Sequence, residues 1–114
     1  MDETILNNLV GELKRGTQVL AVLAHLHRGQ YGYSLLQDLS SQGVNIEAGT
    51  LYPLLRRLES QGLLKSDWDT SETRPRKYYT LSPDGEATFE ALKKQWQMLT
   101  DDINAVLKEN EHGK

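Results

Sequence analysis

The side chains best suited to binding another molecule lie in residues 50–59, which read Thr-Leu-Tyr-Pro-Leu-Leu-Arg-Arg-Leu-Glu. The guanidinium of Arg56 can donate a pair of hydrogen bonds to a guanine edge or a phosphate, and the hydroxyl of Tyr52 can donate to a phosphate. Leucines recur on the opposite side at helical spacing, which predicts a helix with one buried and one displayed face. The leucines are Leu51, Leu54, Leu55 and Leu58. Pro53 lacks an N–H and belongs in an early turn of this helix, and Gly62 is placed to end it in a left-handed conformation. Such a helix could read a DNA groove.

A basic cluster follows this helix, in a segment with the pattern of a β-hairpin. Over residues 63–69 the hydrophobic period falls towards two, so that Leu64 and Trp68 share one face. Residues 77–81 predict a second, antiparallel strand. The basic residues near the tip are Arg74, Arg76 and Lys77. A short helix that displays Arg and Tyr, followed by a basic hairpin, indicates a winged helix-turn-helix in a mainly α chain.

Two leucine-rich helices precede this segment and must supply its packing partners. Residues 5–13 predict an amphipathic helix that we expect to be interrupted near Arg15 and Gly16. Thr17 can then cap a second, largely apolar helix suited to the centre of the domain. We expect residues 29–32 to form a turn, after which a short helix leads to the groove-reading segment.

The longest predicted helix begins at Ser82-Pro83-Asp84, with a capping hydroxyl, a proline in the first turn and a carboxylate at the positive end of the helix dipole. Its hydrophobic residues step by 3, 4, 3, 4 and 3 positions, which is a heptad seam. The helix would be about 40 Å long, too long for so small a domain to cover. We therefore expect the seam to pack against a second copy of the chain. The seam residues are Phe89, Leu92, Trp96, Leu99, Ile103 and Val106.

The composition is typical of one soluble globular domain. The 114 residues are 38% hydrophobic and 25% charged. The chain has no cysteine, which excludes a disulfide framework, a thiolate zinc site and a cysteine nucleophile. No stretch approaches the roughly 20 apolar residues that span a bilayer, and the start, Met1-Asp2-Glu3, does not read as a secretory signal. We expect a cytoplasmic protein with no membrane partner.

The net charge of −3 argues at first against a polyanionic partner, but the distribution of charge matters more. Residues 49–81 carry six bases against four acids, whereas acids outnumber bases beyond Ser82. A basic middle and an acidic C-terminal part would orient the molecule on DNA. Binding should then weaken as the salt concentration rises.

No arrangement of residues indicates catalysis or a metal site. His25 and His27 are two residues apart on a predicted helix, so they face different sides and cannot chelate one ion together. The neighbouring Asp101 and Asp102 do not share a helical face. We find neither a phosphate-binding glycine loop nor a nucleophile beside a base. The sequence predicts no enzyme, no metal and no cofactor.

Three segments resemble the PadR family of bacterial transcriptional regulators. One runs from Gly49 to Glu59 and continues at Gly62-Leu63-Leu64, another is Tyr31-Gly32-Tyr33, and the third runs from Arg74 to Gly85. They occur in the family's order, and the resemblance extends over residues 10–108. The single C-terminal helix resembles the short subfamily.

The resemblance implies a homodimeric repressor with one helix in the major groove and the hairpin, or wing, near the minor groove. In the family, small aromatic or drug-like molecules relieve repression, and in some short members a flat compound stacks on a tryptophan at the dimer interface. Trp96 matches that tryptophan, so the resemblance implies a ligand site at Trp96, Leu92 and Leu99, although packing in the seam would also explain Trp96. Pro75 departs from a wing that is often richer in glycine and basic residues.

The predicted DNA contacts have competing structural interpretations. Arg56 could pair with Glu59 on a solvated face, and Arg57 could brace the core. Tyr52 could pack in the core, Thr50 could cap its helix, and the wing cations could simply be solvated. The predicted DNA-contacting residues are Tyr33, Ser34, Thr50, Tyr52, Arg56, Arg57, Arg74, Arg76 and Lys77.

We therefore expect a winged helix-turn-helix over residues 1–82, a dimerisation helix over residues 83–110 and a disordered tail over residues 111–114. The predicted function is a homodimeric repressor on double-stranded operator DNA, released by a small planar hydrophobic or phenolic molecule, as in multidrug or phenolic sensing. One alternative is a regulator without a small-molecule ligand. Another is a protein–protein adaptor, which would need an apolar face where Arg56 and Tyr52 lie.

Overall fold

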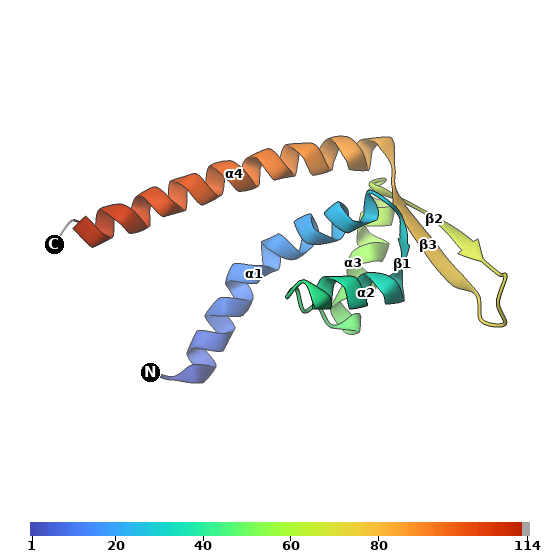
Figure 1. Cartoon of the computed structure of the whole chain (residues 1–114), viewed down its shortest axis with the longest axis horizontal. Helices are drawn as coiled ribbons and strands as arrows, with labels where there is room; N and C mark the ends of the chain where they lie inside the picture. Colours follow the sequence, from blue (N-terminus) through green and yellow to red (C-terminus); the bar gives the residue numbers. More distant parts are fainter. Residues whose placement is uncertain (113–114) are drawn as a thin grey trace.

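The computed structural model describes residues 1–112, which form four helices and a small three-stranded sheet at one edge of the molecule (Figure 1). Gly113 and Lys114, the end of the predicted tail, lie outside the described residues. The mainly α fold class with a small hairpin and a long C-terminal helix is confirmed. The helices are α1 (Glu3–Leu26), α2 (Gly32–Ser41), α3 (Ala48–Ser60) and α4 (Pro83–His112), and the strands are β1 (Gln30–Tyr31), β2 (Leu64–Asp69) and β3 (Arg76–Leu81).

The sheet is antiparallel and has the order β1-β3-β2. β2 and β3 form the predicted hairpin, with pairs from Leu64↔Leu81 to Asp69↔Arg76. The prediction of a simple turn over residues 29–32 is wrong for Gln30 and Tyr31, which pair with β3 as a third strand. Two residues are too few to show a period of two, and their hydrogen-bond partners lie far along the chain, so local sequence carries no signal for this strand.

Leucines from three helices meet over the inner face of the sheet and form the core. α3 supplies Leu51, Leu55 and Leu58, all at most 2% exposed, as the helical spacing predicts. Gly62 has φ +81° and ends α3 as expected. The other core residues are Val22, Leu23, Leu26, Leu35, Leu39, Ile46, Leu64, Tyr79 and Leu81.

α1 is a single helix, so the predicted interruption near Gly16 is wrong. Asp2 caps it by accepting a hydrogen bond from the Thr4 N–H at 2.9 Å. Thr17 does not cap a new helix, because its hydroxyl donates to the Lys14 carbonyl at 2.7 Å within the same helix. A glycine costs about 1 kcal/mol in a helix interior, which flanking turns can offset. α1 bends about half-way along its length (Figure 1), and a glycine beside a hydroxyl residue is a common cause of such bends.

The structure adds detail to the sequence predictions for Trp68, Thr50 and Pro53. Trp68 alternates in phase with Leu64 but lies beyond the edge of the core, where it is 64% exposed. Thr50 does not cap α3, because the helix already begins at Ala48, with Glu47 in the capping position and no side-chain cap. Pro53 is therefore the sixth residue of α3, within its second turn.

The start of α4 is fixed tightly to the body of the molecule. Ser82 accepts a hydrogen bond from the Gly85 N–H at 2.9 Å, as a capping residue should, and donates to the Gly62 carbonyl at 2.6 Å. A Cβ on Gly85 would lie 2.0 Å from the carbonyl oxygen of Leu63. The helix can therefore pass this turn so closely only because residue 85 is a glycine.

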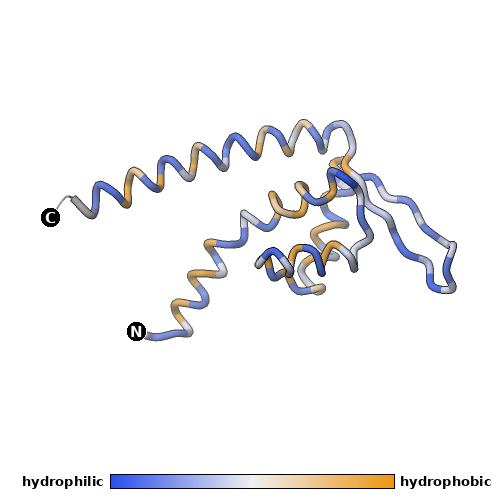
Figure 2. The backbone as a smooth tube through the Cα atoms, in the orientation of Figure 1, coloured by the Kyte–Doolittle hydropathy of each residue, from blue (hydrophilic) through white to orange (hydrophobic). Residues whose placement is uncertain are grey.

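Two helical segments, which we call the arms, extend away from residues 17–92, which we call the body. The arms are residues 3–16 of α1 and residues 93–110 of α4, and they lie on the side of the body opposite the wing (Figure 1). Hydrophobic positions recur along both arms (Figure 2). The molecule is elongated, with extents of 63 × 34 × 23 Å. No helix among the described residues has the length and hydrophobicity required to cross a membrane.

Candidate nucleic-acid interface

α3 presents a polar strip, which we call the recognition strip, on the side opposite its buried leucines. Arg56 and Arg57 are both exposed there. Within the described residues neither guanidinium forms an ion pair, so the alternative pairing of Arg56 with Glu59 is not present. The exposed residues of the strip are Gly49, Thr50, Pro53, Arg56, Arg57 and Ser60. The small residues Gly49 and Thr50 precede the two arginines on α3 and allow a close approach to a groove.

Tyr52 lies at the border of this strip, where α3 meets α2. It is partly buried and packs against the core. A Cβ on Gly32 would lie 2.6 Å from its ring, so the glycine of the Tyr31-Gly32-Tyr33 motif makes room for the tyrosine. The structure thus gives Tyr52 a packing role, and its contact with DNA stays a prediction.

The first turn of α2 lies beside α3 and contributes two of the predicted residues. Tyr33 is 66% exposed, and its hydroxyl accepts a hydrogen bond from Gln37 at 3.1 Å. The hydroxyl of Ser34 donates to the Tyr31 carbonyl at 3.0 Å. Tyr33 is therefore available to a partner, whereas the Ser34 hydroxyl already has an acceptor.

Arg76 joins the wing to β1 through a network that the sequence analysis did not find. Its guanidinium lies 4.1 Å from the centre of the Tyr31 ring and pairs with Asp69 at 3.6 Å and Glu72 at 3.4 Å. The Asp69 carboxylate also accepts hydrogen bonds from Tyr31 and Ser71. The bonds from Ser71 and Tyr31 lower the pKa of Asp69 to about 2, and the bond to Asp69 raises the pKa of Tyr31.

Lys77 joins the wing to α3. Its Nζ lies 3.4 Å from Oε1 of Glu59, and it lies 5.5 Å from the centre of the Trp68 ring. Glu59 also accepts a hydrogen bond from Ser66 on β2 at 2.5 Å. This bond and the nearby Lys77 lower the pKa of Glu59, although partial burial opposes them.

Arg74 differs from the other two wing cations. It is exposed near the tip, and no ion pair involves it within the described part of the chain. Of the three predicted wing cations, Arg74 is therefore the one that forms no ion pair with a carboxylate of the described residues.

A cleft of about 290 Å³ separates the wing from the two helices of this face. Its walls bring together the predicted residues Tyr33, Tyr52, Arg76 and Lys77. Trp68 and Tyr31 also line it, and the sequence analysis did not assign them to the site. Tyr31 belongs to the motif that carried the family resemblance, whereas the position of Trp68 in the cleft depends on how the hairpin sits against α3.

A second hollow, of about 460 Å³, lies between α1 and α4 and is mostly apolar. It brings together the three residues predicted to bind a ligand, Leu92, Trp96 and Leu99. The opposite wall comes from α1, which the sequence analysis did not include. Its residues are Leu13, Gly16, Thr17, Val19 and Leu20.

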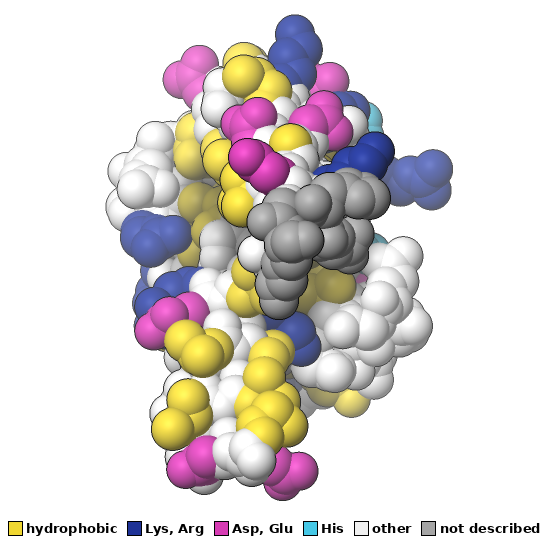
Figure 3. Space-filling view, turned by 90° about the vertical axis from the view of Figure 1, so that its left-hand side faces the viewer, with side chains coloured by type: hydrophobic (Ala, Val, Ile, Leu, Met, Phe, Trp, Pro, Cys, Tyr) yellow, Lys and Arg dark blue, Asp and Glu magenta, His cyan; other side chains and the backbone are white. Residues whose placement is uncertain are grey.

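The seam of α4 divides into two parts. Phe89 and Leu92 are partly buried against the core of their own chain. The remaining seam residues are 43–61% exposed, and they are Trp96, Leu99, Ile103 and Val106. The α1 arm also exposes hydrophobic residues, which are Ile5, Leu6, Leu9 and Leu13. Hydrophobic side chains gather on the face of the molecule that carries the arms (Figure 3).

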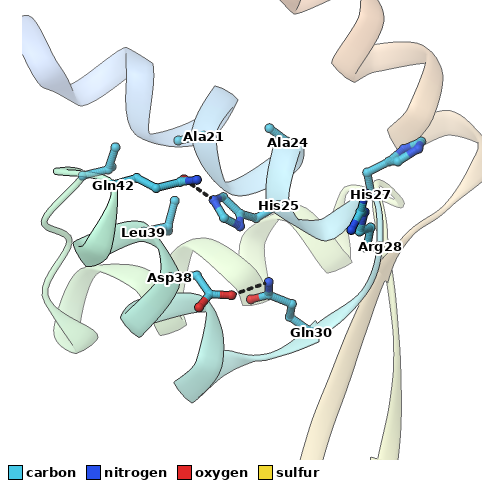
Figure 4. Close-up of a pocket in the computed structure, with 10 residues that line it drawn as sticks. Ala21, Ala24, His25, His27, Arg28, Gln30, Asp38, Leu39 and Gln42 are labelled. Carbon is cyan, nitrogen blue, oxygen red and sulfur yellow. Dashed lines mark hydrogen bonds between the residues drawn. The ribbon is translucent and has the colours of Figure 1, made fainter.

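A third hollow lies between α1 and α2, and several of the polar side chains that line it are hydrogen-bonded to one another (Figure 4). His25 is hydrogen-bonded to Gln42 at 2.7 Å, and Gln30 donates to Asp38 at 2.9 Å. His27 is bonded instead to Glu86 at the start of α4, at 2.9 Å. No cluster of three His, Asp or Glu residues able to hold a metal ion is found within residues 1–112.

Comparisons with known proteins agree on one family. The model of the transcriptional regulator PadR-like family matches residues 19–91. The transcriptional regulator Rv3488 of Mycobacterium tuberculosis is 38% identical over 79 residues, which is 68% of this chain and 74% of that protein. The transcriptional activator GvpE of Haloferax mediterranei is 36% identical over 77 residues, 67% of this chain and 38% of that protein.

The fold is also similar to solved structures. A PadR family transcriptional regulator from Eggerthella lenta is 46% identical, with a TM-score of 0.88, and the match covers 92% of this chain and 94% of that one. A PadR-like transcription factor from Bacteroides fragilis is 32% identical, with a TM-score of 0.74, over 87% of this chain and 98% of that one. The similarity therefore includes both arms as well as the body.

Proposed function

Because this chain belongs to the PadR-like family of transcriptional regulators, we propose that it is a homodimeric repressor released from operator DNA by a small planar hydrophobic molecule. Family membership establishes the coarser function, a DNA-binding transcriptional regulator of the winged helix-turn-helix type. The same relatives confirm the prediction that the chain is not an enzyme. Repression, the dimer and the ligand are our proposals.

The observation that supports the DNA-binding face is that α3 and the wing each expose arginines that form no ion pair within the described residues. Arg56 and Arg57 point outward from α3, and Arg74 lies near the tip of the wing. In the proposed complex α3 enters the major groove, where Arg56 contacts base edges or phosphates. The wing lies along the adjacent backbone, where Arg74 and Lys77 neutralise phosphates.

The exposed hydrophobic residues of the two arms support a homodimer. An isolated leucine on a surface needs no explanation, but a contiguous apolar face indicates an interaction site. The arms of two copies can cover one another along the heptad seam of α4, with the α1 arm packing beside it. The dimer would then place its two α3 helices about 34–36 Å apart, on one face of the duplex.

The hollow between α1 and α4 is the proposed effector site. It is apolar, it has room for a small aromatic molecule, and Trp96 offers a large flat surface for stacking. A ligand there would change the angle between α4 and the body. It would weaken operator binding only if it prefers the arrangement in which the two α3 helices no longer match the grooves.

The DNA-binding face is tested by removing two of its cations. Arg56→Ala combined with Lys77→Ala should weaken binding to a DNA fragment selected by the purified protein by about 100-fold, because one base or phosphate contact and one wing contact are lost in each subunit. Binding would be measured by fluorescence anisotropy.

The matched control removes two charges from α4 instead, as Lys93→Ala with Lys94→Ala. This variant should bind DNA within about twofold of the unmodified protein, because its lysines lie away from α3 and the wing. Equal losses in the two variants would show that the total charge matters rather than the proposed face.

A further inference from the structure

The ion pair between Glu59 and Lys77 connects α3 directly to the wing. Each side chain is 31% exposed, so the pair lies at the edge of the cleft and not in the core. Glu59 uses its two oxygens for different partners, Oε1 for Lys77 at 3.4 Å and Oε2 for Ser66 at 2.5 Å. The bond to Ser66 holds one oxygen of the carboxylate in position, so the contact of the other oxygen with Lys77 can open separately.

The carboxylate of Glu59 gives Lys77 the same kind of contact that a DNA phosphate would give. Both groups are oxyanions that accept hydrogen bonds from an ammonium group. While Lys77 is paired with Glu59, the two charges cancel, and the wing attracts DNA less than its sequence suggests. A phosphate that enters the cleft must therefore compete with Glu59 for Lys77.

Arg76 is held in a way that does not permit such an exchange. Its guanidinium lies over the Tyr31 ring and pairs with two carboxylates. Asp69, one of these, is itself fixed by Tyr31 and Ser71. Movement of Arg76 would disturb the attachment of the wing to β1, whereas Lys77 can leave Glu59 by rotation of one flexible side chain.

We propose that Glu59 is an internal substitute for a DNA phosphate, which holds Lys77 in the free protein and releases it to the DNA backbone on binding. This inference rests on the proposed DNA-binding face. Because phosphate contacts carry no sequence information, Glu59 lowers affinity for all DNA equally. It therefore limits retention on random DNA without choosing the operator.

The test replaces Glu59 by glutamine, which keeps the shape and the acceptor for Ser66 but removes the charge. Glu59→Gln should bind a fluorescein-labelled duplex of mixed sequence about two- to fivefold more tightly at low salt, the range that surface ion pairs span. This gain in affinity should become smaller as the salt concentration rises, because screening weakens the ion pair between Glu59 and Lys77 that competes with the phosphate. Circular dichroism would verify that the fold is unchanged.

The matched control is Glu90→Gln, which removes one charge from another ion-paired glutamate, 3.2 Å from Lys93 on α4. It measures the effect of net charge alone and should change affinity by less than Glu59→Gln does. In a Lys77→Ala background, Glu59→Gln should produce no more than this control effect, because the cation it would release is absent.

A second variant, Glu59→Asp, keeps the charge but shortens the reach towards Lys77. If Glu59 holds Lys77, Glu59→Asp should show part of the gain in DNA affinity that Glu59→Gln shows. The inference is overturned if Glu59→Gln binds DNA no more tightly than Glu90→Gln. It is equally overturned if the gain in affinity persists in the Lys77→Ala background, or if Glu59→Asp binds DNA as the unmodified protein does, since Glu59 would then act by general repulsion. Failure of the DNA-binding face itself would appear separately, as undiminished binding by the variant that combines Arg56→Ala with Lys77→Ala.

Discussion

The body and the arms of this molecule are built from the same pattern of leucines at helical spacing, but only the body covers its own leucines. Leu51 and Leu55 in α3 are fully buried, whereas Leu13 in the α1 arm is 79% exposed and Leu99 in the α4 arm is 57% exposed. Burying one such side chain stabilises a protein by about 1.5–3 kcal/mol. Hydrophobic periodicity thus identifies a face that needs a partner, but it does not tell whether that partner belongs to the same chain.

The body and the arms therefore have different roles in the proposed dimer. The body can fold around its own core and carries the recognition strip, the wing and the cleft. In the proposed dimer, the arms would gain their stability from a second copy and would set the distance between the two bodies. Three sets of variants test this comparison.

The largest effect should come from a charge in the α4 arm. Ile103→Asp places a carboxylate in the proposed seam, where burial without a partner is costly. The dimer should dissociate at micromolar concentration, and binding to a selected operator should fall by at least about 100-fold because one subunit cannot hold two half-sites. Sedimentation equilibrium and anisotropy would measure the two effects.

Gln97→Asp is the matched control, since Gln97 is exposed on α4 and lies outside the seam. It should leave both the mass and the affinity unchanged. If Ile103→Asp remained a dimer, the arms would not form the dimer interface, whereas the description of the body would be unaffected.

A smaller effect distinguishes a leucine of the body from a leucine of the arms. Leu55→Ala should lower the free energy of unfolding by about 2–5 kcal/mol, because it leaves a cavity in the core. Leu99→Ala should lower the melting temperature mainly at low protein concentration, where mass action no longer maintains the dimer. Thermal unfolding over a range of concentrations would separate the two. The same dependence on concentration for both variants would mean that body and arms fold as one unit.

The smallest effect concerns the hollow between α1 and α4. With Trp68→Phe as background, Trp96 is the remaining tryptophan of the two in the chain, and a planar aromatic dye should quench its fluorescence. In the unmodified background Trp96→Ala should weaken dye binding by about tenfold through loss of stacking, as calorimetry would measure. Met98→Ala, which changes an exposed residue outside this hollow, should bind the dye normally.

The sequence predicted the elements whose signals are local. The spacing of Leu51, Leu55 and Leu58 predicted the buried face of α3. Gly62 predicted where α3 ends, and the Ser82 hydroxyl predicted where α4 begins. Each of these features is decided within a few residues by side-chain periodicity or backbone conformation.

The features that the sequence did not predict depend on residues far apart in the chain. β1 exists because β3 pairs with it, and α1 continues through Gly16 despite a local signal to stop. The partners of Lys77 and Arg76 could not be read from charge counts, because Glu59 approaches Lys77 only when the hairpin folds back onto α3. Trp68 was correctly placed on the face of Leu64, but its exposure depends on where the core ends.

Hydroxyl-radical footprinting on an operator selected from random DNA tests the central claim most directly. Two copies joined through their arms should protect two patches of backbone centred about one helical turn apart, on the same face of the duplex. Each patch should weaken in the variant that combines Arg56→Ala with Lys77→Ala. A single patch of one half-site, bound by one copy of the chain, would contradict the account.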